Sequence, residues 1–240
     1  MDYDKLNSQL MVLAILIVIV VFFVYTRSFT DDVPSCDNYI TNVYLYVLLA
    51  LLITSFSVLF IAKRKYPITS TKVLLAFAVA MLSLFTIFMI NPNNVLFNHA
   101  VWITFIIAIS VSIYKIWRVS EYRGVLTNTL IITLLLTIGL ISVSHTRPDW
   151  VQLSWGSILT VALLAGLFAW IIPMIFADIT KMTIYYKFLS AIFVFIFMMF
   201  ILYDTKLLRI NAMNCIVPNY PKDSFGLFLD VINLFTMQTI

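Results

Sequence analysis

Charged side chains are scarce in this sequence of 240 residues. Only 11% of the residues are Asp, Glu, Lys or Arg and 62% are hydrophobic, whereas soluble domains contain roughly 25% charged residues. Glutamate occurs once, as Glu121, and histidine twice, as His99 and His145. A zinc protease helix needs a His-Glu-x-x-His pattern, and a hydrolase needs a nucleophile beside an orienting base. Because neither pattern is present, we expect no enzyme activity and no bound cofactor.

Glycine and cysteine are also rare, with five and two residues. No glycine-rich phosphate loop is present, and the net charge of +4 comes from basic residues that are spread between apolar runs rather than gathered in one patch. We therefore do not expect a nucleic-acid partner. Cys36 and Cys215 both lie in predicted loops. A disulfide would require both to face one oxidising compartment, which the sequence leaves open, and we expect unpaired thiols.

Long apolar runs dominate what remains. A helix of about 20 apolar residues crosses the hydrocarbon core of a membrane. We therefore predict an all-α fold, a polytopic membrane bundle of seven to eight transmembrane helices that forms one integral membrane domain over residues 1–240. The first run is expected to be a retained helix, because its flank is not basic as in a signal peptide. The expected spans are 9–26, 42–62, 72–90, 98–117, 125–143, 153–177, 184–203 and a shorter segment, 224–240, interrupted by Asp230.

Loop charges predict the orientation of these spans, because basic loops stay in the cytoplasm. The connections with the strongest basic character follow the second and fourth runs and carry Lys63, Arg64, Lys65, Lys72, Lys115, Arg118 and Arg123. The acidic connection with Asp31, Asp32 and Asp37 then lies on the far side. The segment 204–223 conflicts with this pattern: its basic residues, Lys206, Arg209 and Lys222, favour the cytoplasm, but an odd number of crossings places it outside.

Several residues inside the runs have structural interpretations. Gly139, Gly156 and Gly166 are expected to permit close contact between helices. Trp102 and other aromatic residues near the ends of spans are expected to anchor the chain at the membrane interface. His99, at the start of the fourth span, is expected to be interfacial rather than a pH sensor.

Asp204 and Asp230 are the candidate functional residues, because a carboxylate in apolar sequence of membrane depth is costly to ionise. They are separated by 26 positions and a polar connection that contains prolines, which is enough chain to bring the last helix beside the preceding one. Two carboxyl groups that face each other in a medium of low dielectric can share one proton and lose it as the pH rises. The pair could then serve as a pH-dependent latch. With Thr205 and Asn233 it could also offer calcium the oxygen ligands that this ion prefers.

Two other interpretations of the aspartates stay open at this point. In the first, Asp204 caps a helix end and Asp230 pairs with Lys206 or Arg209. In the second, the chain is an intramembrane aspartyl protease. Tyr203-Asp204 resembles the Tyr-Asp motif that contains the first aspartate of that class. That class also needs a Gly-x-Gly before its second aspartate, and Leu-Phe-Leu precedes Asp230 here. Half of that signature is missing, which disfavours the second interpretation.

The residues around both aspartates resemble the C-terminal signature of the transmembrane Bax inhibitor motif family. The resemblance rests on residues 201–205 (Ile-Leu-Tyr-Asp-Thr) and 225–235 (Phe-Gly-Leu-Phe-Leu-Asp-Val-Ile-Asn-Leu-Phe). The basic connection 63–67 (Lys-Arg-Lys-Tyr-Pro) also resembles this family's link between its second and third helices. The compact length suits a viral member of the family as well as a cellular one.

The resemblance implies roles for individual residues. In this family, compact bundles of helices leak calcium and dampen cell death. Asp204 and Asp230 match its pH-sensitive gating pair, which also makes them the candidate calcium ligands, and Lys63 or Arg64 matches a basic latch. The neighbouring motif residues are Tyr203, Thr205 and Asn233. The family has six spans before the last, half-polar one, whereas this chain has seven, which predicts an added or re-entrant helix.

The resulting functional prediction is a pH-sensitive calcium-leak channel, or a channel-like regulator of intracellular calcium, that inhibits apoptosis. Calcium is expected as the permeant or bound ion, with membrane lipid and cell-death regulators or other calcium channels as partners. The alternative is a non-conducting membrane adaptor that modulates such proteins by binding them. The resemblance places the protein in the endoplasmic reticulum or Golgi, with the plasma membrane as an alternative.

Overall fold

The chain folds almost entirely into helices, as expected. The computed structural model describes residues 3–30, 33–64, 68–176 and 183–239. The only strands in these ranges form a short antiparallel pair in which β1 (Phe29–Thr30) faces β2 (Val33–Pro34). The helices are α1 (Tyr3–Ser28), α2 (Tyr39–Arg64), α3 (Ser70–Met89), α4 (Val95–Tyr122), α5 (Leu126–Thr146), the 3-10 turn η1 (Pro148–Trp150), α6 (Trp155–Phe176), α7 (Thr183–Met213), α8 (Tyr220–Asp223) and α9 (Phe225–Gln238).

Six of the described helices are long and apolar enough to cross a membrane, namely α1 to α5 and α7. The apolar part of α6 that was assessed, Trp155–Ala169, is shorter, and so is α9 with 14 residues. Each of the eight predicted segments corresponds to one of these helices. The all-α, polytopic membrane class is therefore confirmed, and the basic residues 65–67 of the predicted link lie outside the described residues.

The end of α7 differs from the prediction. A polar loop was expected from residue 204, but the helix continues to Met213. Lys206 and Arg209 are therefore helical residues. The reason is that residues 204–213 contain no glycine or proline, and Leu, Lys, Arg, Met and Ala in this stretch are good helix formers.

Local signals in the sequence account for several helix ends. Thr69 caps α3 by accepting a hydrogen bond from the backbone N–H of Lys72 at 3.3 Å, and Asn219 caps α8 in the same way through Lys222. Such caps satisfy backbone donors that have no partner within the helix. Gly124 adopts a φ of 69° between α4 and α5, a conformation that costs glycine little.

The chain divides into two compact units. The first unit comprises Met1–Val119 and Asn211–Phe228, and the second comprises Ser120–Ile210 and Leu229–Ile240. Helices α7 and α9 each contribute residues to both units. The organisation of the whole chain as one membrane domain stays a prediction.

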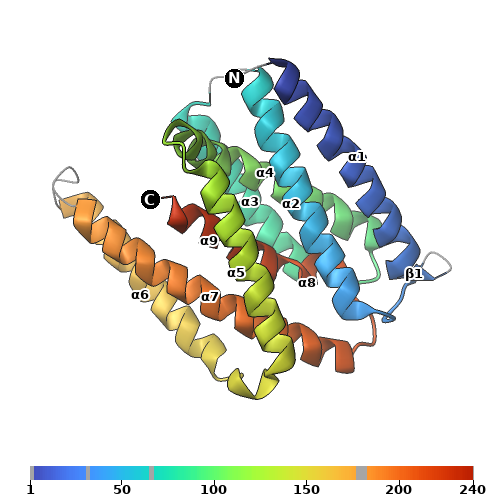
Figure 1. Ribbon diagram of the computed structural model, residues 1–240. Helices are drawn as coiled ribbons and strands as arrows, with labels where there is room; N and C mark the ends of the chain where they lie inside the picture. The colour runs from blue at the N-terminus through green and yellow to red at the C-terminus, as the bar shows by residue number, and fades with distance from the viewer. Residues whose placement is uncertain (1–2, 31–32, 65–67, 177–182, 240) are drawn as a thin grey trace. The chain divides into compact units, whose positions relative to one another are not determined.

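In the first unit α1 lies alongside α2 (Figure 1), where Leu6 and Leu10 pack with Leu59. The aromatic core of this unit joins α4 to the start of α9, because the rings of Phe105 and Phe225 meet edge to face with centroids 4.5 Å apart. Edge-to-face pairs of this kind are favourable beyond the area that they bury.

In the second unit α6 lies beside α7 (Figure 1). Two of the predicted close-contact glycines make this approach, because a Cβ atom at Gly156 would meet the side chain of Tyr203 and one at Gly166 would meet the ring of Phe193. Gly139 has nothing within 4 Å of such an atom among the described residues. The expectation is therefore confirmed for Gly156 and Gly166 and wrong for Gly139.

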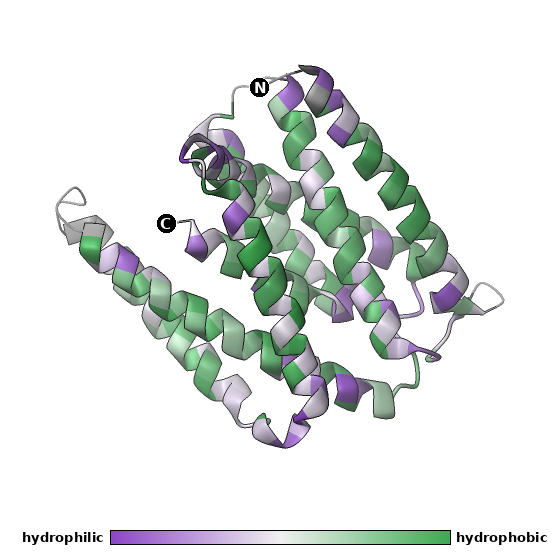
Figure 2. Cartoon of the chain, in the orientation of Figure 1, coloured by the Kyte–Doolittle hydropathy of each residue, from purple (hydrophilic) through white to green (hydrophobic). Residues whose placement is uncertain are grey.

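Large apolar side chains cover much of the outer surface of the helices. Figure 2 shows hydrophobic residues along the lengths of the helices and hydrophilic residues mostly towards their ends. Phe22 in α1, Leu82 in α3 and Leu135 in α5 are each more than 60% exposed. Apolar exposure on this scale marks a surface that contacts lipid or another apolar phase. The chain is an integral, multi-pass membrane protein.

Candidate functional site

The structure brings Asp204 and Asp230 together. Asp204 lies half-buried within α7, and Asp230 in α9 is 6% exposed. Their two carboxyl groups lie close enough to interact with each other. Two carboxylates that close repel when both are ionised. The second oxygen of Asp230, Oδ2, is buried and has no hydrogen-bond partner among the described residues.

The predicted motif neighbours surround this pair unequally. Thr205 is 1% exposed, and its hydroxyl is buried without a hydrogen-bond partner within the described part of the chain. The ring of Tyr203 packs against Gly156, which fixes this turn of α7 against α6. Asn233 lies half-buried about one turn beyond Asp230 on α9. Thr205 and Asp230 are therefore both shielded from solvent.

Within the described residues, no group of three or more His, Cys, Asp or Glu side chains is placed to hold a metal ion. Calcium takes six to eight oxygen ligands, which can include hydroxyl groups, carbonyl groups and water. The part of Asp204 and Asp230 as calcium ligands stays a prediction.

The alternative interpretation of the aspartates is wrong in its first part, because Asp204 lies within α7 rather than at its end. Lys206, one of the predicted partners of Asp230, instead donates hydrogen bonds to the carbonyl oxygen of Pro148 at 2.9 Å and to that of Val151. The group that interacts with Asp230 is Asp204.

Cys36 and Cys215 form a disulfide, so the prediction of unpaired thiols is wrong. The bond lies in the first unit and ties the connection before α2 to the connection after α7. The sequence could not show this pairing, because it depends on the approach of residues that are 179 positions apart.

Tyr220 is the centre of a polar network beside the disulfide. Its hydroxyl donates a hydrogen bond to the carbonyl oxygen of Ser35 and accepts one from Nδ2 of Asn42 at 3.1 Å. Asn42 is fully buried and also donates to the carbonyl oxygens of Arg27 at 3.1 Å and Asp37 at 2.9 Å. These bonds hold the start of α8 against the connection between α1 and α2.

Two more contacts fix the segment that leads into α9. The hydroxyl of Tyr39 donates to Asp223 at 2.8 Å, and burial raises the pKa of the Asp223 carboxyl while this hydrogen bond opposes the rise. Trp102 donates to the hydroxyl of Ser224 at 3.1 Å and is 2% exposed. The expectation that Trp102 anchors the chain at the membrane interface is therefore wrong.

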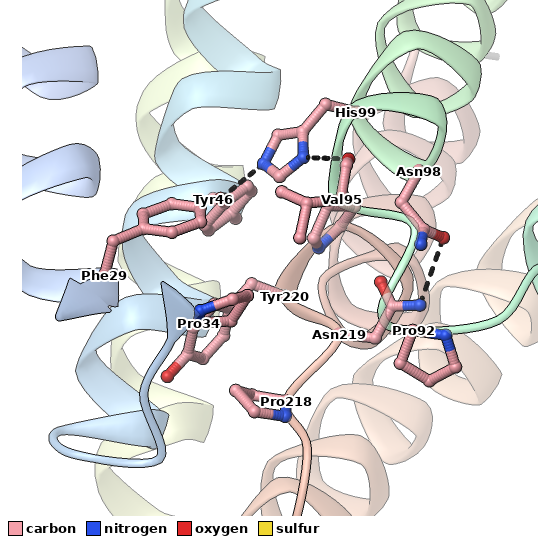
Figure 3. A pocket seen from close by; sticks show the side chains of 11 residues that line it. Phe29, Pro34, Tyr46, Pro92, Val95, Asn98, His99, Pro218, Asn219 and Tyr220 are labelled. Atoms are coloured by element: carbon pink, nitrogen blue, oxygen red, sulfur yellow. Dashed lines mark hydrogen bonds between the residues drawn. The ribbon is translucent and has the colours of Figure 1, made fainter. Parts of the chain in front are cut away.

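His99 takes part in the same region. Figure 3 shows its ring between Tyr46 and Val95, in a pocket that Tyr220 and Asn219 also line. Nδ1 lies 2.7 Å from the carbonyl oxygen of Val95 and must donate to it. Nε2 therefore accepts the hydrogen bond from the Tyr46 hydroxyl, 2.6 Å away. His99 has a structural partner that no sequence pattern indicated.

The disulfide bears on the conflict between loop charges. The six helices α2 to α7 separate Cys36 from Cys215, and both cysteines face one compartment, which must be oxidising. An even number of crossings satisfies this condition if all six helices cross. Lys206, Arg209 and Lys222 then lie towards the non-cytoplasmic side. Two of these charges have local partners, since Lys206 binds carbonyl oxygens and Lys222 lies over the ring of Phe88.

The predicted latch residues, Lys63 and Arg64, end α2 in the first unit. The guanidinium of Arg64 lies 5.4 Å from the centre of the Phe60 ring, a cation–π contact within the same helix. Their part in a latch stays a prediction.

Comparison with known proteins gives one match. A family model described as "Inhibitor of apoptosis-promoting Bax1" matches residues 36–238. No curated protein and no solved structure matches the chain. The matched region begins after α1 and includes α2 to α9. The added or re-entrant helix that the span count predicted stays a prediction.

Proposed function

The chain belongs to the Bax inhibitor-1 family, and from that premise we propose that it is a pH-sensitive calcium leak whose gate is the Asp204–Asp230 pair. The observation that carries this proposal is the close approach of two shielded carboxyl groups on different helices. Two carboxyl groups that close together can share one proton and lose it as the pH rises, so their interaction depends on pH.

Loss of the shared proton supplies the force that opens the gate. Two unit charges about 4 Å apart repel by about 4 kcal/mol at an effective dielectric constant of about 20. A change of about 4 kcal/mol shifts a two-state equilibrium by about a thousandfold. Repulsion between Asp204 on α7 and Asp230 on α9 therefore favours their separation, and the separated carboxylates attract a cation.

The ligands around the pair support calcium as a passing ion. Carboxylate and hydroxyl oxygens suit this hard cation, and the hydroxyl of Thr205 lacks a hydrogen-bond partner among the described residues. An incomplete ligand set lets an ion leave again, which conduction requires.

The disulfide supports an organelle of the secretory pathway as the location. Disulfides persist in oxidising compartments such as the lumen of the endoplasmic reticulum, and Cys36 and Cys215 form one here. We propose the endoplasmic reticulum or Golgi, where a leak would pass stored calcium towards the cytosol. The plasma membrane has the same redox arrangement and is the alternative.

Calcium flux into dye-loaded liposomes tests this function. The purified protein should conduct calcium, and the flux should rise with pH over the range in which the pair loses its proton. Asp204→Asn and Asp230→Asn should each make the flux independent of pH, because an amide does not ionise there. Asp149→Asn is the matched control, since Asp149 is an exposed aspartate in the second unit. An unchanged pH response in both pair variants would refute the gate.

A second candidate function is a non-conducting regulator of cell death that acts by binding other membrane proteins. The description of the matching family, which names inhibition of an apoptosis-promoting protein, favours it. This candidate predicts no flux at any pH, together with stable recovery of membrane partners by both the wild-type protein and the Asp204→Asn variant.

A further inference from the structure

Helix α5 has its polar face turned inwards. Thr129, Thr133 and Ser144 are each at most 5% exposed. The opposite face is apolar and open, with Leu135 64% exposed and Ile138 54% exposed. In a membrane, polar residues face the interior of a bundle or a water-filled cavity. The inner face of α5 is therefore the part of this helix that water or ions could reach.

This face contacts both helices that carry the aspartates. The hydroxyl of Ser144 donates to the carbonyl oxygen of Leu202 at 3.0 Å, two residues before Asp204 on α7. The hydroxyl of Thr133 donates to Oε1 of Gln238 on α9 at 3.2 Å. The row of hydroxyls thus runs from the turn of α7 beside the gate to the last residue of α9.

Several polar atoms on α5, α7 and α9 are buried but have no hydrogen-bond partner in the described part of the chain. The hydroxyl of Thr137 and Nε2 of Gln238 have no hydrogen-bond partner among the described residues, and neither do Oδ2 of Asp230 and the hydroxyl of Thr205. Asp230 and Thr205 are both more than nine-tenths buried. Water is the usual partner of buried polar atoms that the protein itself leaves unpaired.

The positions of these residues along their helices set the length of the row. Asp230 and Gln238 are eight residues apart on α9, which corresponds to about 12 Å at a rise of 1.5 Å per residue. Thr137 is one turn from Thr133 on α5, in the direction of Ser144. The exposed Arg123 donates to the carbonyl oxygen of Thr239 at 3.0 Å and so holds the chain just beyond α9 at the other end of the row.

We propose that Thr129, Thr133 and Thr137 of α5, together with Gln238 of α9, line a hydrated path that carries cations between the aspartate pair and the Arg123 end of the second unit. This inference rests on the proposed leak function and adds the route that the ion takes after the gate. The hydroxyl and amide oxygens replace part of the hydration shell of the ion along this route.

Helix adhesion is the competing explanation for the same row, because hydroxyl groups also hold membrane helices together. Under that explanation, removal of the hydroxyls alters stability but admits no water and leaves the flux unchanged. The hydrated path predicts the opposite pattern, so two measurements distinguish them.

Labelling of an introduced cysteine with a water-soluble reagent tests whether the path is hydrated, and this test does not depend on calcium flux. Thr137→Cys should react with a water-soluble methanethiosulfonate reagent, because only a hydrated thiol ionises and reacts. Leu135→Cys, on the exposed apolar face of the same helix, is the control and should resist labelling in a bilayer. The background is low because both natural cysteines are paired. An unreactive Thr137→Cys in folded protein would overturn the path.

Flux through the same liposomes tests the route. The double variant Thr133→Val/Thr137→Val should conduct about tenfold less calcium, equivalent to about 1.4 kcal/mol, with its pH dependence retained. Thr133→Ser/Thr137→Ser should restore the flux, and Thr146→Val, which removes an exposed hydroxyl bonded within its own helix, should not alter it. Wild-type flux in the folded valine variant would overturn the route. Labelling of Thr137→Cys without flux in any protein would instead support the hydrated path and refute the leak function.

Discussion

Replacement of Cys36 and Cys215 by serine should destabilise the first unit substantially. The bond joins residues 179 positions apart, and a chain-entropy calculation for a loop of that length gives about 5 kcal/mol. This value is an upper bound, because membrane helices stay formed when their packing is lost. A flexible loop of about 15 residues gives about 3 kcal/mol, which we take as the lower bound.

The expected loss can be converted to a melting temperature. For chains of about this length, 1 kcal/mol shifts Tm by about 2–4 °C, so the double variant should melt about 6–20 °C below the wild-type protein. The polar network around Tyr220 should keep the segment near its place at lower temperatures, because its hydrogen bonds to Ser35 and Asn42 do not involve sulfur.

Thermal unfolding in mild detergent, followed by tryptophan fluorescence, measures this loss. With reductant, the wild-type protein should have the same Tm as the Cys36→Ser/Cys215→Ser variant. Reductant should not change the Tm of the variant. The single variant Cys215→Ser should match the double one. Two results together would refute the disulfide and the topology built on it. The Tm of the wild-type protein would not change with reductant, and the protein unfolded without reductant would show two free thiols.

Two further predictions use the same melting assay. Gly166→Ala should lower the free energy of unfolding by about 1–3 kcal/mol, because the new Cβ would lie 2.8 Å from the ring of Phe193. Gly139→Ala is the matched control. Equal Tm values for these two variants would contradict the close contact. Because the folded protein raises the pKa of Asp223, this carboxyl favours folding when protonated, and its contribution is lost as the pH rises from about 4 through the raised pKa. Asp223→Asn keeps an acceptor for Tyr39 and should flatten this part of the stability profile, whereas a profile that coincides with the wild-type one at every pH would contradict the assignment.

The helices could be predicted because their cause is local. Six of the apolar runs are long enough to form a spanning helix, and their composition predicts a helix without information about neighbours. The end of α7 was missed for a related reason. Half of residues 204–213 are polar, but polar residues alone do not end a helix, and the breaker, Pro218, comes only later.

The aspartates could be singled out because an ionised carboxyl group in apolar sequence of membrane depth has a high free-energy cost. Their partners could not be identified in the same way. The disulfide, the network around Tyr220 and the bond between Tyr46 and His99 depend on segments that meet only in the folded chain. The threonines of α5 do recur every four residues, but a hydroxyl in a membrane helix can bond to its own backbone, so spacing alone did not distinguish them.

The disulfide also has a consequence for how the protein is made. Cys36 precedes α2 and Cys215 follows α7, so the bond can close only after six further helices have been synthesised and inserted. Cys36 must remain reduced, or pair transiently with another thiol, throughout that period. The oxidised form is therefore a chemical record of completed assembly, and its appearance on a non-reducing gel would time the last stage of biogenesis in the cell.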